Sequence, residues 1–191
     1  MTIRRATKED AEKAAILIRF AIKEIAETLT GETKEEKILA VLGDFFRSSG
    51  NRMSYENTLV YEQDGQVAGL IIAYHGKDAV ALDEPIAERL RRKKNDPSIN
   101  IDKEAEMEDF YLDTISVDPD FRGKGIGTSL IHQMEAFGVE KGYPSISLIV
   151  EDVNPDAGRL YKRLGYKKTK MIRVSDGEFA YMVKELEKTP V

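Results

Sequence analysis

The chain has 191 residues, a net charge of −5, 41% hydrophobic residues and 33% charged residues, which is the composition of a soluble globular protein with one well-filled domain. The acidic balance disfavours nucleic acid as the main partner, and the absence of cysteine excludes disulfides, thiolate metal sites and an acyl-cysteine intermediate. No apolar run reaches the roughly 20 residues needed to cross a membrane, and the charged N-terminus lacks a signal-peptide core, so we expect a cytoplasmic protein without membrane contact.

The N-terminal part of the chain predicts a short strand followed by two helices. Residues 2–6 form the strand, and Thr7 and Asp10 then resemble a capping box with aspartate in place of the usual glutamate or glutamine. Apolar residues recur at helical spacing over 8–29, which predicts one amphipathic helix. A second helix is expected at 33–48.

A hairpin and a long polar segment come next. The pair Asp64-Gly65 favours a tight turn between strands at 58–62 and 67–74. Residues 77–106 are polar and contain one helix-like stretch at about 84–94, whose basic end is typical of a solvated helix C-terminus. We expect a solvated insertion here, with a lid or a partner surface as the alternative.

A glycine-rich turn, Phe121 to Thr128, lies between a strand-like run at 110–119 and a helical pattern over 125–141. Glycines remove Cβ atoms where backbone amides must turn toward one point, and the helix that follows adds positive potential there. Such a turn binds phosphate or pyrophosphate, and Arg122 and Lys124 supply positive charge. The spacing excludes the Walker loop and the dinucleotide fingerprint. A plain strand-to-helix turn is the alternative.

The C-terminal part predicts a buried strand at 145–150, a helix that begins at Asn154, and two further strands. Asparagine followed by proline suits a helix N-terminus. The last strands are expected at about 166–174 and 178–186, with their turn at 175–177. Helices and strands together indicate a mixed α/β domain.

Two of these segments resemble motifs of one family. The run from Arg122 to Gly127 is similar to the Arg/Gln-x-x-Gly-x-Gly/Ala pattern of the GNAT superfamily of acyl-CoA-dependent N-acetyltransferases, and the run from Asn154 to Tyr166 is similar to its Asn-x-x-Ala-x-x-Leu-Tyr-x-x-x-Gly-Phe segment. The resemblance covers about residues 2–186. It implies one GNAT-like domain over 1–191, with a mostly antiparallel sheet splayed between its fourth and fifth strands and an insertion at 77–106 between the third and fourth.

The resemblance also implies acetyl-CoA as co-substrate, bound in the splay. Pantetheine would pair with the main chain of the fourth strand, and the pyrophosphate would lie on the amides of the glycine-rich turn. Two histidines and no cysteine argue against a metal centre. Asn154 would face the cofactor, with a simple helix cap as the alternative. The implied cofactor residues are Ile115, Ser116, Val117, Arg122, Gly123, Lys124, Gly125, Ile126, Gly127, Thr128 and Asn154.

In the family, a tyrosine at the position of Tyr161 protonates the departing thiolate; packing on a helix face is the alternative. The base is open: alignment with relatives favours Asp109, with Glu108 and Asp113 as runners-up, and any of these acids can simply be solvated. Alternation along the strand predicts one face made of Asp109, Tyr111, Asp113, Ile115 and Val117, and an opposite face made of Glu108, Phe110 and Leu112.

Taken together, these residues predict an N-acetyltransferase that moves the acetyl group directly to a primary amine. The acceptor is a small molecule or a protein N-terminus, and Glu24, Glu27 and Glu32 either attract this cation or form the polar face of a helix. The alternative function is a non-catalytic acyl-CoA-binding sensor or scaffold. The oligomeric state, a homodimer included, stays open.

Overall fold

The computed structural model describes residues 1–151, 154–174 and 177–186. Its strands are Thr2–Arg5 (β1), Thr58–Gln63 (β2), Gln66–His75 (β3), Phe110–Val117 (β4), Ser145–Glu151 (β5), Lys167–Val174 (β6) and Gly177–Glu185 (β7). In this part of the chain they form one sheet in the order β1-β2-β3-β4-β5-β7-β6. Neighbours pair antiparallel except β4 and β5, which are parallel. The mixed α/β class with a mostly antiparallel sheet is therefore confirmed.

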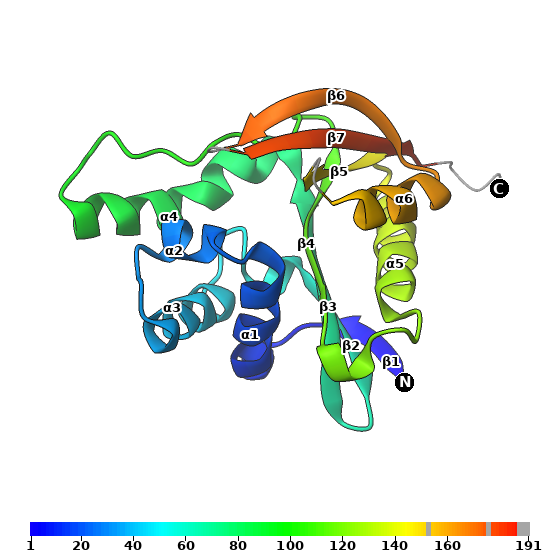
Figure 1. Ribbon diagram of the computed structural model, residues 1–191, viewed down its shortest axis with the longest axis horizontal. Coiled ribbons are helices and arrows are strands. Elements are labelled where there is room, and N and C mark those ends of the chain that lie inside the picture. Colours follow the sequence, from blue (N-terminus) through cyan, green and yellow to red (C-terminus); the bar gives the residue numbers. More distant parts are fainter. Residues whose placement is uncertain (152–153, 175–176, 187–191) are drawn as a thin grey trace.

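Helices cover both faces of this sheet (Figure 1). They are Ala11–Ile22 (α1), Ile25–Thr30 (α2), Glu35–Arg47 (α3), Ala79–Lys94 (α4), Ile126–Lys141 (α5) and Pro155–Arg163 (α6). α1 to α4 lie on one side of the sheet, and α5 and α6 lie on the other. Among these described helices none is both long and apolar enough to cross a membrane.

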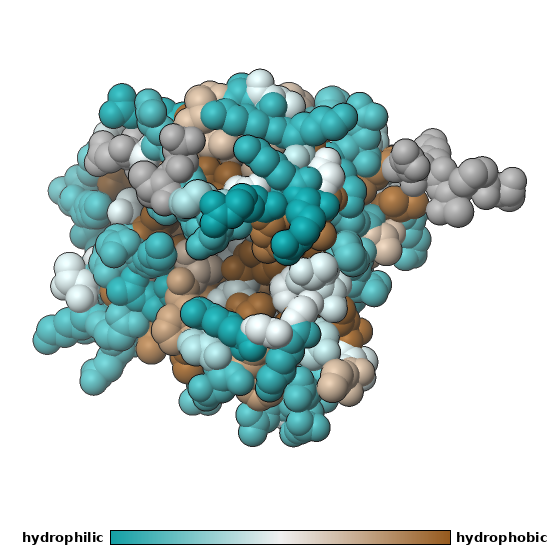
Figure 2. Space-filling model, turned by 45° about the vertical axis from the view of Figure 1, so that its right-hand side comes forward, coloured by the Kyte–Doolittle hydropathy of each residue, from teal (hydrophilic) through white to brown (hydrophobic). Residues whose placement is uncertain are grey.

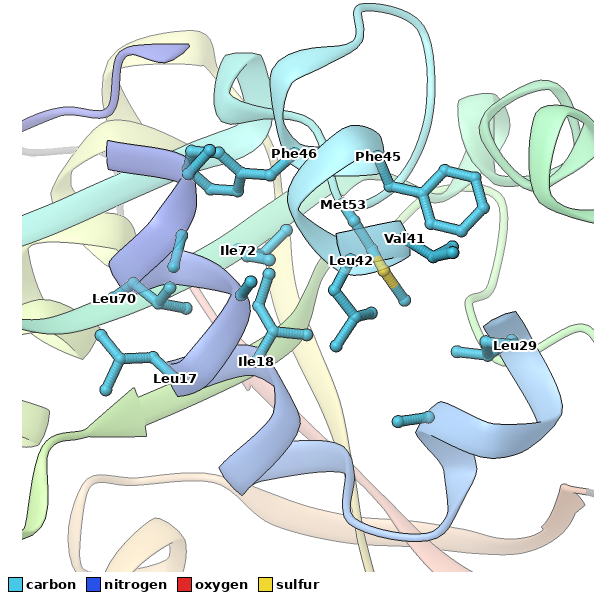
Figure 3. Packing of buried hydrophobic residues seen from close by; sticks show 14 of the residues in the cluster. Leu17, Ile18, Leu29, Val41, Leu42, Phe45, Phe46, Met53, Leu70 and Ile72 are labelled. Carbon is cyan, nitrogen blue, oxygen red and sulfur yellow. The ribbon is translucent and has the colours of Figure 1, made fainter. Parts of the chain in front are cut away.

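A hydrophobic cluster fills each side of the sheet. The first packs α1, α2 and α3 against β3, and Figure 3 shows its side chains converging between these elements. The second packs α5 against β3, β4 and β5. The labelled members of the first are Leu17, Ile18, Leu29, Val41, Leu42, Phe45, Phe46, Met53, Leu70 and Ile72.

The continuous helix predicted at 8–29 is wrong, because the chain breaks at Lys23. A 3₁₀ turn at Lys8–Asp10 precedes α1, and Lys23 has a φ of 46°, which separates α1 from α2. The side chain of Arg19 stabilises the chain at this break, because it donates to the Lys23 carbonyl and forms ion pairs with Glu27 (2.8 Å) and Glu35 (3.1 Å). The capping box of Thr7 and Asp10 is confirmed.

The helix predicted at 84–94 begins earlier, at Ala79, and is not a solvated insertion. α4 runs through Pro85 and buries Ile86, Ala87 and Leu90. Pro85 lies well inside the helix, where its missing N–H and its ring normally end a helical pattern. The sequence therefore predicted the helix only from about residue 84. The helix ends at Asn95, in the left-handed conformation.

The hairpin is confirmed in detail. Asp64 (φ 53°) and Gly65 (φ 75°) both adopt positive φ between β2 and β3, as a two-residue turn between twisted strands requires. The turn predicted at 175–177 falls largely outside the described residues, although the two strands that flank it pair as expected.

Candidate active site

The sheet opens between β4 and β5. The two strands pair only at Phe110 with Ile146 and at Tyr111 with Ser147. Beyond these pairs β4 bonds only to β3, while β5 bonds to β7, within the described strands. One edge of β4 from Leu112 onward therefore presents N–H and C=O groups to a wedge. The space-filling view in Figure 2 shows a hollow near the middle of the face, with apolar side chains between hydrophilic borders.

A β-bulge interrupts β4 where the wedge begins. Leu112 pairs with Ala73 and Thr114 with Ile72, so Asp113 is an extra residue on β4. The bulge reverses the alternation of side chains along the strand. Tyr111 packs with Tyr74, Ala79 and Ala105 on the α4 side, whereas Ile115 and Val117 pack against the cluster on the α5 side. The predicted common face of Asp109, Tyr111, Asp113, Ile115 and Val117 is therefore wrong.

The glycine-rich turn joins the end of β4 to the start of α5. Gly123 and Gly125 both have a φ of 76°, a left-handed conformation that favours glycine, although a Cβ would meet no atom within 4 Å. Among the described residues, the amides from Gly123 to Thr128 donate to no backbone carbonyl. The next amide, that of Ser129, donates to the Gly125 carbonyl (3.0 Å). The amides between them suit an anion.

The two cations of this turn are exposed. Arg122 donates from Nε to the Val117 carbonyl (3.3 Å), and Lys124 Nζ lies 4.9 Å from the centre of the Phe121 ring. Both charges therefore lie next to the free amides without an ion pair among the described residues. This arrangement fits a polyphosphate, as the sequence predicts.

Sequence reasoning missed Gly69 on β3. A Cβ at this position would lie 2.9 Å from the Ser116 carbonyl oxygen and 3.2 Å from Ile126 Cγ2. The first turn of α5 can therefore approach the sheet only because residue 69 has no side chain. A glycine inside a strand pattern is the signal that could have indicated such a close approach.

Tyr161 lies on α6 and is buried, with its ring 5.7 Å from that of Tyr166 at an angle of 67°. Burial raises the pKa of Tyr161 to about 12, so the phenol stays protonated at neutral pH. At the start of the same helix, Asn154 Oδ1 accepts a hydrogen bond from the Ala157 amide (3.2 Å). Asn154 is therefore an N-cap, and this role does not exclude a contact with a cofactor.

Asp109 lies at the closed end of the wedge and is nearly buried. It accepts hydrogen bonds from Ser145 Oγ and from Tyr181 Oη, each at 2.7 Å. The Tyr181 oxygen in turn accepts from the Glu106 amide (3.1 Å), and burial raises the pKa of Tyr181 well above its usual range. Ile115 is six positions after Asp109, which is roughly 20 Å along an extended strand.

A buried ion cluster joins the bulge of β4 to the insertion. Arg52 is 4% exposed and pairs with Asp83 (3.3 Å) on α4, with Glu104 (2.9 Å) and with Asp113. Tyr74 donates to Asp113 (3.2 Å) and Tyr111 donates to Glu104 (2.8 Å). Three carboxylates thus surround one cation, and we name this group the Arg52 cluster. It was not predicted, because its members are far apart in sequence.

The acidic residues proposed to attract an amine are largely engaged within the protein. Glu27 pairs with Arg19, and Glu32 pairs with Lys93 (2.6 Å) and Arg89 (3.1 Å) of α4. Glu27 fits the alternative, the polar face of a helix, whereas Glu32 lies in the loop after α2 and pairs with α4. The described residues also contain no group of three His, Cys, Asp or Glu side chains placed to bind a metal ion.

Comparison with known proteins gives consistent matches. A family model described as the acetyltransferase (GNAT) family matches residues 21–166. A crystal structure described as an acetyltransferase superposes with a TM-score of 0.82 at 34% identity, over 98% of this chain and 100% of the other. An N-acetyltransferase from Staphylococcus aureus Mu50 gives 0.83 at 23% identity, over 96% and 100% of the chains, which shows the fold alone.

Curated relatives match over shorter segments. An uncharacterized N-acetyltransferase of Methanocaldococcus jannaschii is 38% identical over 74 residues, 39% of this chain and 31% of its own length. The thialysine N-epsilon-acetyltransferase of Bos taurus is 42% identical over 55 residues, 29% of this chain and 32% of its own length. The chain thus spans about a third of the length of these relatives.

Proposed function

The chain belongs to the acetyltransferase (GNAT) family, and on this premise we propose that it transfers the acetyl group of acetyl-CoA directly to a primary amine. One observation carries the proposal: the open edge of β4 leads straight into a turn whose amides lack backbone partners among the described residues. A strand edge suits the amide groups of pantetheine, and the turn suits its pyrophosphate. A plain strand-to-helix turn would need neither an open strand edge nor amides without backbone partners.

Residues on both sides of the wedge would hold acetyl-CoA, which supplies the reactive thioester when bound. We propose that the main chain of Ile115, Ser116 and Val117 pairs with pantetheine. The amides from Gly123 to Thr128 would bind the pyrophosphate, with Arg122 and Lys124 beside it. A main-chain amide of β4 would stabilise the developing oxyanion. We propose that Asn154 combines its role as a helix cap with a contact to the cofactor.

Tyr161 is the proposed general acid. A phenol with a pKa of about 12 is protonated at neutral pH and can donate to a thiolate as it departs. Burial is the cause of the raised pKa, and it also keeps water from competing for the proton.

For the base we propose Asp109, with Asp113 as its competitor. Both carboxylates already accept hydrogen bonds, Asp109 from Ser145 and Tyr181, and Asp113 from Tyr74. Asp113 lies in the bulge, closer along β4 to the residues proposed to hold pantetheine, so the two substitutions by asparagine should separate them by their effect on turnover.

The acceptor is proposed to be a primary amine of a small molecule or of a protein N-terminus. The name of the bovine relative, which specifies an N-epsilon position, supports an amine acceptor. A cytoplasmic setting, where acetyl-CoA and amines are available together, is part of this proposal.

The test begins with thermal unfolding in the presence of acetyl-CoA, dephospho-CoA or free acetate. Ligand at 100 times its dissociation constant adds about 2.7 kcal/mol, which is roughly 5–10 °C for a chain of this size. Thiol release with a panel of amines follows, and the chain contributes no thiol because it lacks cysteine. No shift at millimolar acetyl-CoA would refute the proposal, while a shift without thiol release for any amine would favour a sensor.

Tyr161→Phe separates binding from chemistry. We expect turnover to fall by about 10²–10⁴-fold, with the thermal shift by acetyl-CoA retained. Turnover equal to that of the wild type under single-turnover conditions would remove Tyr161 from the chemistry.

A further inference from the structure

A second cavity, of about 280 Å³, lies at the other end of α5 from the glycine-rich turn. β3 extends past the start of β2, because Thr58 pairs with Ile72 while β3 continues to His75. The cavity occupies the space beside these last residues of β3. The α5 residues that line it, Met134 and Phe137, come 8 and 11 positions after Ile126, so they lie roughly 12–17 Å along the helix from the proposed pyrophosphate site.

Aromatic rings form much of the cavity wall. The rings of Phe110 and Tyr143 stack at 4.9 Å with an angle of 20°, and Phe137 lies 5.9 Å from Phe110. His75 lies 4.8 Å from Tyr143. Leu59, Ala73 and Met134 add aliphatic surface. A flat apolar group can therefore be buried here against ring faces and edges.

Charges of both signs stand at the rim. The Arg5 guanidinium lies 4.9 Å from the centre of the Phe137 ring, and its Nη1 donates to the Glu56 carbonyl (3.4 Å). Glu56 and Asp78 also line the cavity and are exposed, and Glu56 Oε2 accepts one hydrogen bond, from the Gly50 amide (3.3 Å). None of these three side chains forms an ion pair with another described residue, although ion pairs are frequent elsewhere in the structure. The rim can thus offer both charges to a ligand.

We propose that this cavity binds a small zwitterion that carries a flat apolar group, which is the chemistry of a free aromatic amino acid. Its carboxylate would pair with Arg5, its ammonium group with Asp78 or Glu56, and its ring would lie among Phe110, Phe137 and Tyr143. The volume, just below the usual range of about 300–1,000 Å³ for small-molecule pockets, limits the ligand to this size. The site is separate from acetyl transfer and does not depend on the proposed function.

The test is isothermal titration calorimetry without acetyl-CoA, with four probes. L-Phenylalanine has all three features, 2-phenylethylamine lacks the carboxylate, 3-phenylpropionate lacks the ammonium group, and L-alanine lacks the ring. We expect saturable binding of phenylalanine that is tighter than that of each of the other three. No saturable binding of phenylalanine at millimolar concentration, or equal binding of phenylethylamine, overturns the proposal.

Variants locate the site. Arg5→Gln should weaken phenylalanine and phenylpropionate by about five-fold, as for an exposed ion pair, and leave phenylethylamine unchanged. Asp78→Asn should weaken phenylalanine and phenylethylamine instead. Arg159→Gln removes another exposed cation, on α6, and as the control should change nothing. Phenylalanine binding that neither Arg5→Gln nor Asp78→Asn weakens would place it elsewhere, for example at the amine site, and overturn the assignment.

Discussion

Replacing Asp83 by asparagine should change how the stability of the protein depends on pH. The Asp83 side chain is 14% exposed and lies 3.3 Å from Arg52. Burial raises the pKa of Asp83 to about 6 from 3.8, because the charged form loses its hydration. Arg52 opposes this shift, while the carboxylates of Asp113 and Glu104 add to it.

The sign follows from proton binding. A carboxyl group whose pKa is higher in the folded state holds its proton more tightly there, so its contribution to stability is full below about pH 4. That contribution is lost as the pH rises through about 6. A shift of about two pKa units corresponds to about 3 kcal/mol. Asparagine stays neutral, so the free energy of unfolding of Asp83→Asn minus that of the wild type should rise by up to this amount between pH 4 and pH 8.

Urea denaturation at intervals from pH 4 to pH 8 measures this difference. Taking the difference between two proteins cancels the titration of the shared groups that lie far from Asp83. Glu84→Gln is the matched control, since Glu84 is the next residue on α4 and its side chain is 58% exposed in an ion pair with Arg91. A difference for Asp83→Asn that is constant over this pH range, or that Glu84→Gln reproduces, would refute the reasoning.

Two further substitutions test the packing around the wedge. Arg52→Met leaves three carboxylates around a site without a cation and should cost about 3–5 kcal/mol, or roughly 6–20 °C in the midpoint of thermal unfolding. A loss within 1 °C would mean that the Arg52 cluster does not stabilise the fold. Gly69→Ala should cost about 1–3 kcal/mol and weaken acetyl-CoA binding, because its Cβ would press on Ser116 and Ile126. Gly158→Ala is the control in calorimetry, because a Cβ at residue 158 would meet no atom within 4 Å. Equal acetyl-CoA affinity of the wild type, Gly69→Ala and Gly158→Ala would contradict the prediction for Gly69→Ala.

Local signals predicted the fold well where they act within a few residues. The Asp64-Gly65 pair fixed the hairpin, and Asn154 marked the start of α6, since both effects come from the backbone next to the residue. The break at Lys23 escaped prediction for the opposite reason. Apolar spacing continues through it into α2, and the interactions that favour it come from Arg19 with Glu27 and Glu35, which no periodicity reports.

In the candidate site, too, features set by local sequence were predicted and features set by tertiary contacts were not. The glycine-rich turn was predicted because its residues form one contiguous motif, and the opening of β4 from β5 was implied by the family resemblance. The side-chain directions on β4 were not, since alternation holds only in a regular strand and nothing in the sequence marks Asp113 as a bulge. The Arg52 cluster also escaped prediction, because its partners are brought together only by the tertiary fold.

The segment 77–106 explains why the bulge is held in place. α4 binds the loop after α2 through Lys93 and Glu32, and the Glu106 amide donates to Tyr181 on β7. The segment also delivers two carboxylates, Asp83 and Glu104, to Arg52, whose other partner is Asp113. A bulged residue has no ladder bonds of its own, so a buried charge pair is an effective way to fix it. The segment therefore supports the point at which β4 leaves β5, and substitutions in it should alter the wedge without touching any group that lines it.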